Sequence, residues 1–218
     1  MKNALLSIIL GLLATASMQA AIIIADSTAG YSGTQGYKNW SYGYCTWASD
    51  SLSPDYSTFT QYNRYGNDLW VSWDMNSGDY GFLTSSQAVP GRESGINQDP
   101  TRRWVSTTAG TITISGLLQK AEAGDPTWSN GARIRILVNG NDVGGYINYL
   151  AYDDLAAHNY STSAIVAIGD KVDFLLDSYG NNGADRSTFT AQISIVPEPG
   201  MLALLAVGGL VVFKRRRA

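Results

Sequence analysis

The sequence has little of what most enzyme active sites need. It holds one histidine and one cysteine in 218 residues. A Ser-His-Asp or Cys-His enzyme requires a base beside its nucleophile, but His158 has no Gly-x-Ser-x-Gly motif to serve and lies in a polar segment typical of a solvated loop. A zinc site needs several His or Cys ligands, and no nucleotide-binding glycine motif is present. We therefore expect no enzymatic activity. A polysaccharide lyase or hydrolase is the less favoured alternative, because two carboxylates suffice for glycoside hydrolysis.

Cys45 is the only cysteine, so the chain forms no internal disulfide. The residue is expected to be a small buried side chain, with a reactive or intermolecular thiol as the alternative.

Charge is also scarce, at 15% of residues. Residues 21–196 hold 10 Lys and Arg against 17 Asp and Glu, a net charge of −7. An acidic surface repels phosphate backbones, which excludes a nucleic-acid partner. The 23 glycines and 13 tyrosines are instead typical of a secreted β protein with tight turns.

The N-terminus has the three parts of a secretory signal. A short basic start precedes the apolar run 4–16, and small residues follow up to Ala21. We predict a signal helix over residues 1–20 with cleavage after Ala20. Cleavage after Ala16 and an uncleaved anchor are the alternatives.

The C-terminus has a second signal. The Pro197-Glu198-Pro199 motif ends the folded region, because proline disfavours regular structure around it. Residues 201–213 are uncharged, and a helix there would rise roughly 20 Å, short for a bilayer core of about 30 Å. The basic residues that follow mark a cytoplasmic end; they are Lys214, Arg215, Arg216 and Arg217. A short transmembrane helix over 201–213 is predicted.

The order of a Pro-Glu-Pro motif, a short apolar span and an Arg-rich end resembles the PEP-CTERM sorting domain, here over residues 197–218. The N-terminal signal implies processing by signal peptidase, and the resemblance implies processing by an exosortase near Pro197-Glu198-Pro199. It also implies export across the inner membrane, a membrane-anchored precursor, and a final place in the cell envelope or an extracellular matrix.

Between these signals, apolar residues alternate as they do in half-buried strands. Strands are predicted over 111–115, 133–138, 143–150, 163–168, 172–176 and 189–195, and a further one over 69–73. Asn139-Gly140 predicts a tight hairpin turn. Residues 117–123 are expected to form a short helix or a loop. The fold class is therefore all-β, with residues 21–196 forming a single sandwich.

Segments 35–44, 102–116, 169–174 and 181–189 are similar to jelly-roll domains of bacterial envelope and polysaccharide-degrading proteins. The resemblance implies a jelly-roll-like β-sandwich akin to carbohydrate-binding modules.

Sugar binding requires flat apolar faces and planar polar groups. The candidate ligand-binding aromatics are Trp40, Tyr42, Tyr44, Trp47, Trp104 and Trp128. The alternative for each is a place in the core, and Trp128, in a polar loop, is the one most expected to be exposed.

Two turns are rich in oxygen ligands. Asp74, Asn76 and Asp79 alternate as calcium ligands do, and Asn181, Asn182 and Asp185 form the second group. Neither fits the full calcium pattern, so plain turns are favoured. No cofactor is assigned, with calcium as the alternative.

The sequence thus predicts an exported, exosortase-processed protein with a non-catalytic carbohydrate-binding-like domain whose partner is extracellular polysaccharide. The main alternative is a structural matrix component without a specific ligand. Two coplanar aromatics exposed on one sheet face or at a loop end would favour binding.

Overall fold

Strands make up most of the described chain. A computed structural model describes residues 20–46, 55–58, 60–64, 67–71, 81–93, 96–178 and 185–196. In these ranges the strands are β1 (Ile22–Asp26), β2 (Trp40–Thr46), β3 (Asp55–Thr58), β4 (Thr60–Arg64), β5 (Asn67–Val71), β6 (Phe82–Leu83), β7 (Gln87–Val89), β8 (Gly91–Glu93), β9 (Ile96–Val105), β10 (Gly110–Lys120), β11 (Ala132–Val138), β12 (Asn141–Leu150), β13 (His158–Val166), β14 (Lys171–Asp177) and β15 (Ser187–Ile195). The helical turn η1 (Tyr37–Asn39) precedes β2.

The predicted terminal helices lie almost wholly outside these ranges. Residues 1–19 and 197–218 are not described, so the signal helix and the transmembrane helix stay predictions. None of the helices in the described ranges is long and apolar enough to cross a membrane.

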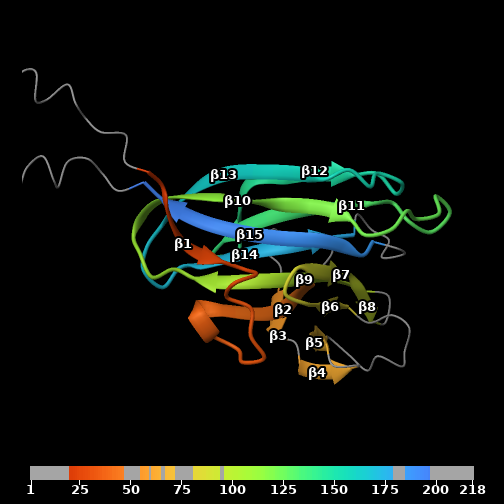
Figure 1. The fold of residues 1–218 in the computed structure, drawn as a ribbon, viewed down its shortest axis with the longest axis horizontal. Coiled ribbons are helices and arrows are strands. Elements are labelled where there is room, and N and C mark those ends of the chain that lie inside the picture. The colour runs from red at the N-terminus through yellow and green to blue at the C-terminus, as the bar shows by residue number, and fades with distance from the viewer. Residues whose placement is uncertain are drawn as a thin grey trace, which may run out of the picture. The chain divides into compact units, whose positions relative to one another are not determined.

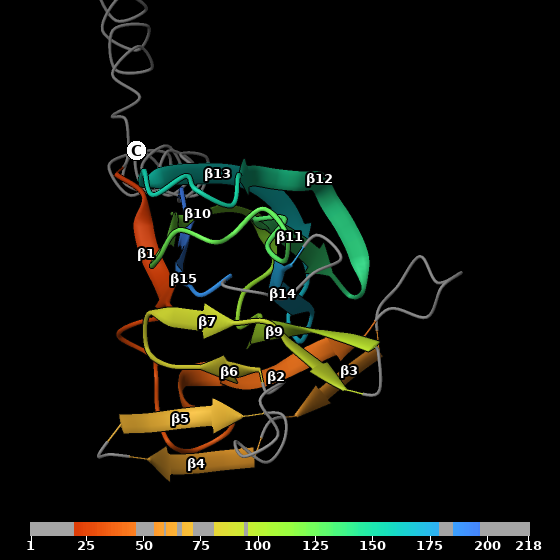
Figure 2. The ribbon, with the colours of Figure 1, turned by 90° about the vertical axis from the view of Figure 1, so that its right-hand side faces the viewer.

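The strands form two sheets (Figures 1 and 2). The first sheet has the order β13-β10-β15-β7-β6-β5-β4, with β1 also paired to β15. The second has the order β12-β11-β14-β9-β2-β3, with β8 paired to β9. Every strand pair with a described register is antiparallel. Residues 23–194 form one compact unit. The predicted all-β sandwich is confirmed.

Alternation along the strands builds the core. In β10, Ile112, Ile114 and Leu118 are fully buried, and Phe189 and Ile193 of β15 lie on the same inner face. The alternate residues Thr113, Ser115 and Leu117 face outward, as the period of two in a strand requires. The buried apolar side chains of both sheets meet in the interior, where each large one contributes about 1.5–3 kcal/mol to folding.

The predicted Asn139-Gly140 turn is confirmed. Both residues have positive φ, 51° and 81°, which suits the two-residue turn that joins β11 to β12. The backbone N–H of Asn139 donates to the Lys171 carbonyl at 2.8 Å, so the turn is also tied to β14.

The sequence predicts a short helix or a loop over residues 117–123. Residues 117–120 instead form the end of strand β10. Their backbone pairs with β15 as far as Lys120, and Leu117 and Leu118 also pair with β13. Tertiary pairing on both sides thus outweighs the weak local preference of this segment. Strand β5 ends at Val71, and Trp73 of the predicted strand 69–73 lies outside the described residues.

One charged side chain lies in the middle of the core. Arg102 of β9 is fully buried, with its guanidinium 5.5 Å from the centre of the Phe189 ring across the sandwich. Among the described residues, its Nε and Nη1 have no hydrogen-bond partner. Burial therefore lowers the pKa of Arg102 to about 10.

Candidate sugar-binding face

The outer face of the first sheet carries a row of short polar side chains. Ser161 of β13 pairs with Ser115 of β10, and Ser115 pairs with Gln192 of β15. The Gln192 amide donates in turn to Asp26 of β1 at 2.8 Å. Neighbouring strands lie about 4.8 Å apart, so the row places a polar group at each step across four strands.

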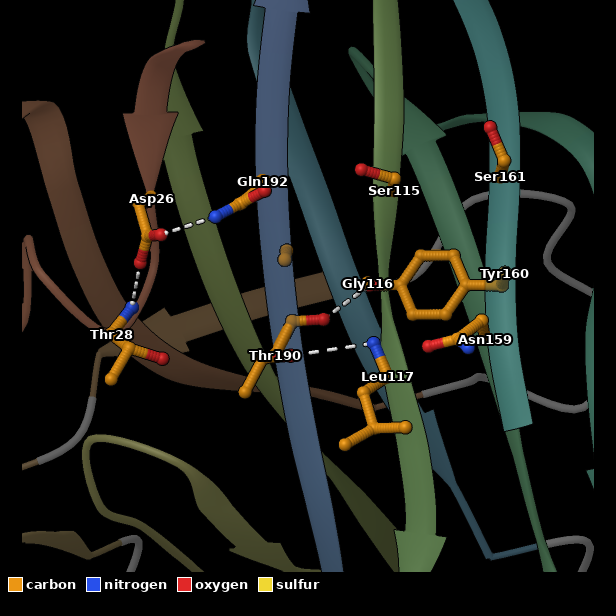
Figure 3. Close-up of a pocket in the computed structure, with 11 residues that line it drawn as sticks. Asp26, Thr28, Ser115, Gly116, Leu117, Asn159, Tyr160, Ser161, Thr190 and Gln192 are labelled. Carbon is orange, nitrogen blue, oxygen red and sulfur yellow. Dashed lines mark hydrogen bonds between the residues drawn. The ribbon is translucent and has the colours of Figure 1, made fainter. Parts of the chain in front are cut away.

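This row borders a depression of about 550 Å³, called here the sheet-face depression (Figure 3). Leu117, Asn159 and Thr190 form the next row of its lining, and Thr28 closes it beside β1. The size falls within the usual range of small-ligand sites, about 300–1,000 Å³.

Asp26 is the one charged residue that lines the depression, and the fold holds it as a fixed acceptor. Its Oδ1 accepts the backbone N–H groups of Thr28 and Ala29 at 2.8 and 2.9 Å. Partial burial raises the pKa of Asp26, but the hydrogen bonds from Ala29, Gln192 and Thr28 outweigh that effect and hold the pKa below its usual value. Because the carboxylate is ionised and already hydrogen-bonded, it is a poor proton donor.

The floor of the depression depends on a glycine. A Cβ on Gly116 would overlap the Thr190 carbonyl and the Tyr160 ring. Without it, the Tyr160 ring lies over Gly116, and its hydroxyl donates to the Thr190 carbonyl at 2.7 Å. Leu117 N–H donates to Thr190 Oγ1 at 3.3 Å. These contacts fix β13, β10 and β15 to one another beneath the depression (Figure 3).

Two hydroxyl groups of the lining are available to a ligand. The side-chain hydroxyls of Ser115 and Ser161 make no hydrogen bond to a described residue, and Ser161 is exposed. Each hydroxyl can donate one hydrogen bond and accept others. With the Gln192 amide on the next strand and the apolar Leu117 in the next row, the surface suits an uncharged ligand rich in hydroxyl groups.

Trp128 lies in the loop over residues 121–131, as the sequence predicts, and its side chain is 51% exposed. Asp125 orders the loop, because its Oδ1 accepts the Thr127 hydroxyl at 2.6 Å and the Thr127 N–H at 2.8 Å. Tyr149, 52% exposed, donates its hydroxyl to the Asn130 carbonyl at 2.6 Å. Two half-exposed aromatics therefore lie at this loop end.

A buried ion pair holds the base of this loop. Lys120 Nζ lies 2.9 Å from Asp185 Oδ1, and both side chains have no exposed surface. The buried Ser129 hydroxyl donates to the same oxygen at 3.0 Å. Burial raises the pKa of Asp185 to about 6, although the hydrogen bond from Lys120 opposes the shift.

The other predicted aromatics are placed differently. Trp40, Tyr42 and Trp104 are at most 1% exposed. They lie in the core, which was the alternative to ligand binding, so a ligand cannot reach them in this conformation. Trp40 pairs directly with Trp104 between β2 and β9. Tyr44 is half-buried, and Trp47 lies outside the described residues.

The predicted calcium ligands are not brought together in the described chain. Asp74, Asn76 and Asp79 lie outside it, as do Asn181 and Asn182, while Asp185 is paired with Lys120. No group of three His, Cys, Asp or Glu side chains in the described ranges could hold a metal ion.

His158 begins strand β13 rather than standing in a loop. Its Nε2 lies 2.9 Å from Asp154 Oδ2, and both side chains are about one-third exposed.

The outer face of the second sheet is occupied by ion pairs. Arg103 donates to both oxygens of Asp173, at 2.6 and 2.7 Å, and its guanidinium lies 3.6 Å from the centre of the Tyr56 ring. Two further pairs lie alongside, Arg133 with Asp177 and Arg135 with Asp142. Each arginine is neutralised by its own carboxylate, so these residues stabilise the sheet and offer no site for an anion.

The residues around the sheet-face depression were not predicted from the sequence. Ser115 and Ser161 stand at outward positions of alternating strands, which is visible in the sequence. That β13, β10, β15 and β1 lie side by side follows from pairings between distant segments, such as Ser27 with Ala191.

Residues 196–218 match the PEP-CTERM protein-sorting motif. The predicted sorting tail with Pro197, Glu198 and Pro199 is thereby confirmed, and the motif implies an exported, exosortase-sorted cell-surface protein. No catalytic family is found. A comparison with curated proteins gives no match.

The sandwich is similar to solved carbohydrate-binding modules. The CBM22-1 xylan-binding domain of Xyn10C from Paenibacillus barcinonensis is 15% identical, with a TM-score of 0.40 over 83% of this chain and 98% of that one. A family 35 module from Clostridium thermocellum is 12% identical, with a TM-score of 0.30 over 62% and 98%. The CBM36-1 domain of a xylanase from the hindgut metagenome of Trinervitermes trinervoides is 14% identical, with a TM-score of 0.33 over 72% and 97%. The likeness is one of general fold.

Proposed function

We propose that this chain is a non-catalytic cell-surface protein that binds neutral extracellular polysaccharide in the sheet-face depression. The observation that carries the proposal is the pair of available hydroxyls, Ser115 and Ser161, beside the amide of Gln192 on a nearly uncharged face. Sugar hydroxyls both donate and accept hydrogen bonds, so side chains that do the same match them without a charge.

Trp128 is the second contact that we propose. Its half-exposed indole offers the flat apolar face that stacks on the C–H side of a sugar ring. The loop around it is held by Asp125 and by the buried Lys120–Asp185 pair, so little order has to be gained on binding.

The route to the surface belongs to the same proposal. Signal peptidase removes residues 1–20, the 201–213 helix holds the precursor in the membrane, and exosortase then releases the domain to the envelope or matrix. A calcium site at Asp74, Asn76 and Asp79 stays a separate prediction.

Retention on insoluble polysaccharides tests the proposal. The protein without its first 20 and last 22 residues keeps every described strand and the buried core. It is expected to be retained on at least one polymer of a panel without releasing sugar. Ser115→Val with Ser161→Val should weaken retention about threefold to tenfold for each hydrogen bond lost. Trp128→Ala should weaken it as well.

The matched control is Thr113→Val with Ser163→Val. These two residues are paired with each other on the same strands and the same face, but they do not line the depression. Equal losses in both double variants would contradict the assignment of the depression. No retention on any polymer would favour a structural matrix component, and released sugar would reveal a lyase or hydrolase.

A further inference from the structure

Strand β13 forms one margin of the first sheet, with β12 of the second sheet lying close to it. Its nine residues pair with β10 from Leu118–His158 to Gly110–Val166 without a register shift. No described strand pairs with its other side, and Figures 1 and 2 both draw it as the outermost strand of its sheet. Residues 159–168 contain no charge and no proline.

The other sheet margins in the described chain differ. β3 and β4, of four and five residues, are short, and they carry Asp55 and Arg64. β12 has two register shifts against β11. Shortness, charge and bulges are the devices by which proteins prevent edge-to-edge pairing. Residues 159–166 of β13 have none of them, and only its first residue, His158, lies beside a carboxylate, that of Asp154.

The side chains of β13 favour pairing with another strand. Ile165 is 80% exposed, and its outward neighbours on the strand are the small residues Ser161 and Ser163. β-Branched residues stabilise a sheet through cross-strand contacts. Within the described part of the first sheet, Ile165 is paired with Thr111 alone.

A second copy of this chain is the partner that fits this edge. Without charges, the edge cannot select a foreign partner electrostatically, and two identical copies do not repel each other along it. Sorting to one cell surface also brings copies of the chain together.

We propose that two copies associate through antiparallel pairing of β13 with β13 about a two-fold axis perpendicular to the first sheet. The two sheets then become one continuous sheet, with both outer faces on the same side. This contact is independent of sugar binding, because the edge of β13 takes part through its backbone.

The geometry predicts which positions approach each other. With neighbouring strands about 4.8 Å apart, the two β13 strands lie one spacing apart and the two β10 strands three spacings, or roughly 14 Å. Ser163 and Thr113 are paired with each other on one face, so they make a matched pair of probe positions, one at the margin and one a strand inward. Cys45 is the only native cysteine and is buried, so an introduced thiol is the only accessible one.

The test combines mass in solution with cross-linking of residues 21–196. Light scattering is expected to show a dimer that dissociates on dilution. A short bis-maleimide should join Ser163→Cys chains at least tenfold faster than Thr113→Cys chains, consistent with the spacing of the strands. Ile165→Lys should raise the dimer dissociation constant by roughly tenfold or more, because charge at an edge opposes pairing. Ile96→Lys, at an exposed isoleucine of the second sheet, should leave the constant unchanged.

Circular dichroism and thermal unfolding of each variant show whether the sandwich is intact, and these exposed sites should leave both unchanged. A monomer at every concentration would overturn the proposal. So would a dimer that Ile165→Lys leaves intact, or one in which both introduced cysteines react at equal rates, since association would then use another surface.

Discussion

At the scale of single residues, the environment of Cys45 determines its chemistry. The thiol is fully buried against Leu137 and Leu175 on the second sheet, with Tyr56 packed beside it. Burial raises its pKa to about 12, and nearby Asp173 and Asp99 act in the same direction. The thiolate is the reactive form, so this placement suits a structural side chain and not the reactive thiol considered as its alternative.

We therefore predict that native Cys45 resists thiol reagents at pH 8. An unfolded cysteine has a pKa of about 8.5, so its thiolate fraction is roughly a thousandfold higher than that of a thiol titrating near 12. Labelling by a chromogenic disulfide should be slow in buffer and complete in denaturant. Rapid labelling of the folded protein would mean that this cluster opens readily.

At the scale of elements, the Lys120–Asp185 pair joins the end of β10 to the segment before β15 and anchors the Trp128 loop. A carboxyl whose pKa is raised to about 6 binds its proton more tightly in the folded than in the unfolded chain. The protonated Asp185 side chain therefore stabilises the folded protein fully at a pH below the unfolded pKa of about 3.9. This stabilisation is lost as the pH rises through the folded pKa of about 6.

The contribution of Asp185 to the free energy of unfolding is expected to rise as the pH falls from 7 to 4, against the opposite contribution of Asp26, whose pKa is lowered. The contribution of Asp185 is at most about 3 kcal/mol, since each tenfold difference in proton affinity corresponds to about 1.4 kcal/mol. Asp185→Asn removes the titrating group and should flatten the profile in this window. Urea unfolding followed by fluorescence at several pH values measures both proteins, and parallel profiles would contradict the assignment.

Strands and turns were predicted from the sequence where local pattern suffices. Alternation gave the apolar faces of β10, β14 and β15, and Asn139-Gly140 gave the turn after β11. The polar loop around Trp128 predicted its exposure, but local pattern could not place Trp40, because only the position of a second sheet buries it. The end of β10 and the sheet-face depression depend on pairings with β13 and β15, which no local pattern contains.

At the scale of the whole molecule, the sheet-face depression and the proposed dimer contact both involve strand β13. Pairing of β13 strands places two sheet-face depressions on the same side of a dimer. A polymer long enough to reach both would bind the second after the first at a high effective concentration, which raises avidity without any new contact.

Ile165→Lys should therefore reduce retention on long polysaccharide by tenfold or more, a modest part of the gain expected from two linked sites. It should leave the affinity for a short oligosaccharide unchanged, because Ile165 does not line the depression. Calorimetry with the oligosaccharide and retention on the polymer provide the comparison. Equal losses in both assays would show that the substitution damages the site itself.

The pairing of β1 with β15 has a consequence for timing. Ser27 and Ala191 exchange hydrogen bonds across 164 residues of sequence. The first strand, β1, therefore pairs with the last strand, β15. Contacts between distant segments form late in folding, because a long loop must close first. A chain that crosses a membrane from its N-terminus cannot form this contact until nearly all of the domain has passed. In the proposed route, in which the N-terminus is exported first, this topology delays closure of the domain until transport is almost complete.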